Sequence, residues 1–72
     1  MKELTIELKE DQEYIELYKL LKFMSLANSG GEAKMFIEDG EVIVNDVVET
    51  RKRNKIKKGF TVQFNGHIVT VK

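Results

Sequence analysis

The chain of 72 residues is long enough for one domain, and its lack of cysteine excludes both disulfides and thiolate-bound zinc. Its composition, 42% hydrophobic and 33% charged, is typical of a soluble globular domain rather than a disordered tail. No apolar run approaches the roughly 20 residues of a membrane span, and the acidic, alternating N-terminus does not resemble a signal peptide. We therefore expect a cytoplasmic protein without a membrane partner.

The net charge of zero hides a strong asymmetry along the chain. Residues 1–50 hold all 12 acidic side chains and five basic ones, whereas residues 51–72 hold seven bases and no acid. Six of these seven lie within residues 51–58, here called the basic run: Arg51, Lys52, Arg53, Lys55, Lys57 and Lys58. Such asymmetry indicates an anionic partner, but neutralisation by the acidic half of the same chain is an equally open interpretation at this point.

The first half of the sequence predicts a strand followed by a helix. Leu4, Ile6 and Leu8 alternate with polar residues, which is typical of a short, half-buried strand. Apolar residues then recur at helical spacing from Tyr14 to Met24. This pattern predicts an amphipathic helix of about 11–13 residues with Asp11 as its N-cap.

A second, shorter helix is predicted over residues 30–39. Ser29 is followed three residues later by Glu32, the spacing of a capping box in which each side chain satisfies a backbone amide of the other residue. Gly40 is placed to end the helix in a left-handed conformation.

Everything after Gly40 is expected to form strands. Two short strands flank a turn at Asn45-Asp46, the basic run follows as a loop, and Lys58-Gly59 forms another turn. Asn65-Gly66 predicts a two-residue hairpin turn. Its register would pair Phe64 with His67, Val62 with Val69, and Phe60 with Val71. The predicted fold class is α+β, with two short helices packed on a small, mainly antiparallel sheet.

No residue set in the sequence predicts catalysis. His67 is the only histidine, and no cysteine or second metal ligand is placed to converge with it. A packing role at the end of a strand explains it better. We therefore expect no enzymatic activity, metal, cofactor or small-molecule substrate.

The basic run is the strongest functional signal. Six cations in eight positions repel one another, and a polyanion would relieve this repulsion if the loop projects from the sheet. Gly30 and Gly31, at the start of the second predicted helix, could let a phosphate approach free amides, although tight packing between the two helices explains them better. Most aromatic residues fall in stripes predicted to be buried and none lies in the basic run, which favours folded RNA over open strands. DNA remains an alternative.

The order of these elements resembles the S4-like RNA-binding domain, also called the alpha-L motif, and in particular its small stand-alone bacterial members. The resemblance spans Leu17 to about Val71. The matching segments are the leucines Leu17, Leu20 and Leu21, then Ser29 to Ala33, Ile37 to Gly40, Val42 to Asn45, and Lys57 to Val62.

This resemblance implies one S4-like domain over residues 1–72, with residues 1–10 as an N-terminal strand extension. It implies non-catalytic binding of structured RNA, either ribosomal RNA or transfer RNA, with a ribosomal subunit as a partner and a role in ribosome assembly or rescue. It nominates Ser29, Gly30, Lys34 and the basic run as the RNA-binding residues, with Gly31 supplying a backbone amide and Lys22 as a weaker addition. Many family members have Arg after the capping Ser, where this chain has Gly30.

A protein-interaction adaptor is the main alternative function. In that interpretation an acidic surface formed by Glu13, Glu16, Glu38 and Asp39 binds a basic protein, and the basic run contacts carboxylates of the chain itself or of its partner. Reversing the charge of Arg51, Lys52 and Arg53 distinguishes RNA binding from the adaptor function. RNA binding would be lost with the fold intact, whereas an adaptor would change little.

Overall fold

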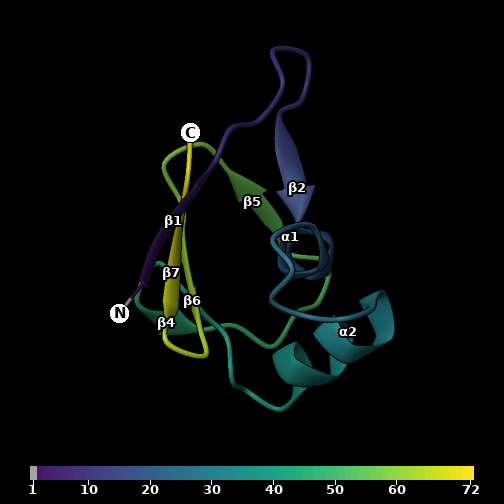
Figure 1. The fold of residues 1–72 in the computed structure, drawn as a ribbon. Helices are drawn as coiled ribbons and strands as arrows, with labels where there is room; N and C mark the ends of the chain where they lie inside the picture. The colour runs from purple at the N-terminus through teal and green to yellow at the C-terminus, as the bar shows by residue number, and fades with distance from the viewer. Residues whose placement is uncertain (1) are drawn as a thin grey trace.

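The computed structural model describes residues 2–72 and has two helices on one side of a five-stranded sheet (Figure 1). The elements are β1 (Lys2–Ile6), β2 (Tyr14–Glu16), α1 (Leu17–Phe23), α2 (Gly30–Glu38), β3 (Ile43–Val44), β4 (Val47–Val48), β5 (Lys55–Lys57), β6 (Thr61–Phe64) and β7 (His67–Val71). The sheet order is β1-β7-β6-β3-β4, and only the pair β1 and β7 is parallel. The predicted fold class is therefore confirmed.

The hairpin of β6 and β7 has the predicted register. Phe64 pairs with His67 and Val62 pairs with Val69. Asn65 and Gly66 have φ angles of 49° and 78°, as a type I′ turn requires. The amide of Val71 donates to the carbonyl oxygen of Phe60 at 3.0 Å, which extends the hairpin by one more step. The inward side chains of these strands form part of the core.

The second helix begins and ends nearly where the sequence predicts. Ser29 is the N-cap, and its Oγ accepts a hydrogen bond from the amide of Glu32 at 3.1 Å. The reciprocal bond differs by one residue, because the Glu32 carboxylate accepts from the amide of Asn28 rather than from that of Ser29. Asp39 is the C-cap, and Gly40 follows with φ of 77°.

The first helix is shorter than predicted, and Asp11 is not its N-cap. Residues 14–16 form β2, which pairs antiparallel with β5, so the helix begins only at Leu17 after Glu16. The helical spacing of Tyr14 and Leu17 is real, but the pairing with a strand far along the chain overrides it. For the same reason the basic run is not wholly a loop, because Lys55–Lys57 form β5.

One hydrophobic core joins the sheet, the helices and the β2–β5 pair. Leu17, Leu20 and Leu21 of α1 are fully buried, as is Ile56 of β5. The ring of Phe36 on α2 lies 4.9 Å from that of Phe64 on β6, centroid to centroid, which fixes α2 against the sheet. The core therefore sets where the start of α2 and the basic run lie.

Candidate nucleic-acid interface

The backbone of the basic run is fixed to the start of α1. The amide of Leu17 donates to the carbonyl oxygen of Asn54 at 3.0 Å, and the amide of Tyr18 donates to that of Lys52 at 3.1 Å. The first amides of a helix lack partners within the helix, and Glu16, the N-cap, provides no side-chain hydrogen bond. The basic run thus completes the N-terminus of α1 and is itself held in place by it.

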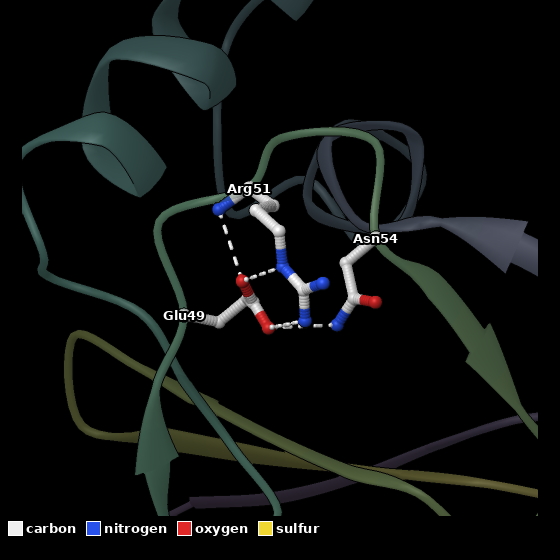
Figure 2. A network of polar contacts seen from close by, with 3 residues as sticks. All are labelled: Glu49, Arg51 and Asn54. Atoms are coloured by element: carbon white, nitrogen blue, oxygen red, sulfur yellow. Dashed lines mark hydrogen bonds and ion pairs between the residues drawn. The ribbon is translucent and has the colours of Figure 1, made fainter.

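Glu49 holds the beginning of the basic run through four hydrogen bonds (Figure 2). Its carboxylate accepts from the Arg51 amide at 3.0 Å, from Arg51 Nε at 2.8 Å and Nη2 at 3.0 Å, and from Asn54 Nδ2 at 3.0 Å. The side chain of Glu49 is only 13% exposed. The hydrogen bond from the Arg51 side chain, more than any other contact, holds the pKa of Glu49 below its ordinary value.

The interpretation that the acidic half of the chain neutralises the basic run holds for two of its six cations. Arg51 forms the ion pair with Glu49, and Lys52 Nζ lies 3.7 Å from Glu38 Oε1. Glu49 lies two residues before Arg51 in the sequence, and the fold brings Glu38 at the end of α2 beside Lys52. The Arg51 side chain nevertheless remains 76% exposed. The Lys52–Glu38 pair is exposed on both sides, so solvent screens it and a stronger anion can displace it.

The other four cations of the basic run are exposed and form no ion pair with residues 2–72. Arg53 lies in the turn before β5, whereas Lys55 and Lys57 alternate with buried Ile56 along the strand and so share its outer face. Lys58 lies past the end of β5 in the turn leading to β6. The fold therefore leaves a set of closely spaced positive charges on a constrained backbone.

Tyr18 connects the basic run to the start of α2. Its backbone amide donates a hydrogen bond to the carbonyl oxygen of Lys52. A Cβ at Gly30 would lie 3.8 Å from the Tyr18 ring, which is an ordinary contact distance. Lys34 Nζ lies 4.7 Å from the centre of the same ring. Tyr18 thus contacts the basic run through its backbone amide, and Gly30 and Lys34 through its ring. Gly31 is exposed, and a Cβ there would meet only Ser29 Oγ at 3.9 Å.

Of the two tyrosines, only Tyr14 differs from the prediction. The helical spacing places both in the buried stripe of one helix, and Tyr18 of α1 does pack against the core, but Tyr14 lies on β2 and is 37% exposed. Lys55 Nζ lies 5.1 Å from the centre of its ring. The alternation of Tyr14, Ile15 and Glu16 was the available signal for a strand, and it was hidden by the helical spacing that overlaps it.

The rest of the described chain adds few other candidate functional residues. Lys22 is exposed in the last turn of α1, and Lys19 is paired with Glu16 at 3.2 Å. His67 is partly buried at the hairpin, with its Nδ1 buried and without a hydrogen-bond partner among residues 2–72. Three or more metal-ligating side chains do not converge anywhere in that range. Neither described helix has the length and apolar character needed to cross a bilayer.

The acidic surface of the adaptor alternative is partly occupied. Glu16 pairs with Lys19, and Glu38 pairs with Lys52, so two of its four carboxylates already have cationic partners within the chain.

Comparison with known proteins identifies relatives over most of the chain. "Putative RNA-binding protein YbcJ" of Escherichia coli (strain K12) is 50% identical over 58 residues, which cover 81% of this chain and 83% of that protein. "Probable ribosome maturation protein RlbA" of Bacillus subtilis (strain 168) is 39% identical over 56 residues, covering 78% and 79% of the two chains.

A solved structure has the same fold. The solution structure of YbcJ from E. coli, described as revealing an alfaL motif involved in RNA-binding, superposes with a TM-score of 0.71 at 46% identity. The match covers 93% of this chain and 84% of that one. A family model described as the S4 domain matches residues 6–72. With two helices on a mainly antiparallel sheet and these relatives, the chain belongs to the S4 domain family and has its alpha-L fold.

Proposed function

We propose that this protein binds structured RNA without catalysing a reaction, through the basic run and the start of α2. The RNA we propose is ribosomal RNA, bound during maturation of a ribosomal subunit. The names of two relatives support this, one as an RNA-binding protein and one as a ribosome maturation protein. The S4 domain family supports a binding protein rather than an enzyme.

The four exposed cations without internal partners carry the proposal. Arg53, Lys55, Lys57 and Lys58 face solvent within a short stretch of chain. Phosphates at their side chains would relieve the mutual repulsion and release counterions, which is the main source of affinity in nucleic-acid binding.

The fixed backbone favours a folded RNA over a flexible strand. Two hydrogen bonds to α1, the pairing with β2 and the Glu49 contacts together hold the basic run in one conformation. A rigid array of charges gains most from phosphates that are themselves held at fixed positions, as they are in a folded RNA. Ser29, Gly30, Gly31 and Lys34 extend this surface along α2, and Arg51 and Lys52 extend it toward β4.

Charge reversal tests the proposal. The double variant Arg53→Glu, Lys57→Glu changes two cations without internal ion pairs, and Lys2→Glu, Lys72→Glu makes the same change in net charge on β1 and at the last residue. We expect the first variant to lose binding to ribosomal RNA in a fluorescence anisotropy titration, and the second to keep it. Both should unfold at the temperature of the parent protein. Equal binding by all three proteins would refute the proposed surface.

The identity of the RNA is tested separately. Crosslinking the protein to RNA in cells and sequencing the attached fragments should recover ribosomal RNA, and the Arg53→Glu, Lys57→Glu variant should lose those fragments. Recovery of mainly transfer RNA, or equal recovery with the variant, would contradict the ribosomal assignment. Competition by folded RNA against duplex DNA at physiological salt excludes or supports DNA as the ligand.

A further inference from the structure

The β2–β5 pair has one apolar face and one polar, aromatic face. Tyr14 pairs with Lys57, Ile15 with Ile56, and Glu16 with Lys55. Ile56 is fully buried and Ile15 packs against the core, so the alternate residues face outward. The outer face therefore carries Tyr14 and Glu16 of β2 beside Lys55 and Lys57 of the basic run, and Glu16 is paired with Lys19 of α1.

Tyr14 differs from the other aromatic residues in this part of the fold. Tyr14 is 37% exposed and is not among the residues packed against the hydrophobic core, whereas Tyr18 packs against the core and contacts the start of α2. Phe23 is more exposed, at 70%, but no cation among residues 2–72 lies over its ring. Tyr14 alone of the three combines an exposed ring with adjacent, unpaired lysines.

An exposed aromatic ring beside lysines is an arrangement that binds unpaired nucleotides. The ring offers a stacking surface for any base, and a lysine beside it can contact the phosphate of the same nucleotide. Lys55 Nζ lies over one face of the ring, 5.1 Å from its centre, so a base would stack on the opposite face with this cation beside it. A fully paired duplex keeps its bases stacked inside and could use only the lysines.

We propose that Tyr14 is a stacking site for an unpaired nucleotide that adjoins a paired region of the RNA. This inference rests on the proposed RNA binding and specifies its substrate class: a duplex with a neighbouring bulge or single-stranded extension. The basic run binds the phosphates of the duplex, and the outer face of the β2–β5 pair receives the unpaired base.

Two RNA probes test this: a hairpin with a fully paired, blunt stem, and the same hairpin with a single-stranded adenosine extension containing 2-aminopurine. We expect the protein to bind the extended hairpin about tenfold more tightly than the blunt one, the magnitude of one stacked base. The 2-aminopurine fluorescence should fall on binding as the base stacks.

Three variants make the test specific. Tyr14→Leu keeps apolar volume on β2 but has no aromatic face, and should bind both hairpins equally and leave the fluorescence unquenched. Tyr14→Phe keeps the ring and should retain the preference. Phe23→Leu removes an exposed ring elsewhere and should also retain it. Circular dichroism and thermal unfolding establish that each variant is folded.

The outcomes separate this inference from the proposed function. If the parent protein binds both hairpins with equal affinity, or if Tyr14→Leu retains the preference, the stacking site is refuted while RNA binding stands. If the parent protein binds neither hairpin, the proposed function fails and this inference fails with it.

Discussion

The backbone amide of Leu17 donates a hydrogen bond to the carbonyl oxygen of Asn54 at 3.0 Å, which joins the first turn of α1 to the middle of the basic run. Leu17 is itself fully buried, so the bond connects the core directly to the charged surface. The cations are consequently displayed from a backbone that the core positions, rather than from a free loop.

The carboxylate of Glu49 should make stability depend on pH. The Arg51 hydrogen bond lowers the pKa of Glu49 in the folded state. The stabilisation that the Glu49 carboxylate gives the fold is therefore complete at pH values above the ordinary glutamate pKa, and it is lost as the pH falls through the folded-state pKa. We expect Glu49→Gln to lower the free energy of unfolding by about 1 kcal/mol near pH 7, because the exposed Arg51 keeps the ion pair screened. The difference from the parent protein should shrink at about pH 3.

Urea unfolding followed by circular dichroism at both pH values measures this effect. Glu10→Gln is the matched control, because Glu10 is exposed and forms no ion pair with residues 2–72. A pH-independent difference between Glu49→Gln and the parent protein would show that the Glu49 charge does not stabilise the fold.

The packing of Ile56 should contribute to the free energy of unfolding by holding β5, and with it the β2–β5 pair, against the core. Ile56→Val removes one methylene from a fully buried site and should cost about 1 kcal/mol of unfolding free energy. Ile68→Val, at a partly buried position on β7, should cost less than half of that. Urea midpoints of the two variants give the comparison. Equal losses would mean that Ile56 does not anchor β5 more firmly than an ordinary strand residue.

The local parts of the fold could be predicted from sequence because their signals lie within a few residues. Asn65 and Gly66 set the hairpin, and Ser29 with Gly40 bounds α2. The extent of α1 could not, because β2 exists only through its pairing with β5, and a helical spacing covers the same residues. Propensity and periodicity are read locally, and a long-range pairing overrides them.

Only part of the candidate site could be predicted from the sequence, because some of its contacts are local and others depend on long-range packing. The cations of the basic run are evident from sequence, and Glu49 lies close enough to Arg51 that their ion pair could have been anticipated. The Lys52–Glu38 pair and the position of Tyr14 beside Lys55 depend on how the helices and strands pack, so no local pattern signals them.

Gly31 tests the contribution of the start of α2. A side chain has room there, since a Cβ would meet only Ser29 Oγ at 3.9 Å. An acid at this position also suits the helix dipole, so Gly31→Glu should fold at least as stably as the parent protein. We expect its RNA affinity to fall about fivefold through repulsion of a nearby phosphate.

Gly31→Gln is the neutral control and should bind nearly as well as the parent protein. Fluorescence anisotropy with the blunt RNA hairpin gives the affinities, and thermal unfolding gives the stabilities. Unchanged affinity in Gly31→Glu would remove the start of α2 from the proposed interface and leave the basic run alone.

The salt dependence of binding should report individual phosphate contacts. Each neutralised phosphate contributes about 0.7–0.9 to the slope of log affinity against log salt concentration. Lys57→Gln should reduce the magnitude of that slope by about this amount, whereas Lys2→Gln on β1 should leave it unchanged. Titrations at several salt concentrations provide the slopes. An identical slope for Lys57→Gln and the parent protein would place Lys57 outside the RNA contact.

Backbone amide chemical shifts, recorded by NMR while the extended RNA hairpin is added, show directly which residues contact the RNA. Our expectation is that the largest changes fall on the basic run, on residues 14–18 and on residues 29–34, which the fold brings together around Tyr18. Changes confined to β1 or to the Asn65-Gly66 turn, or no change at saturating RNA, would contradict it.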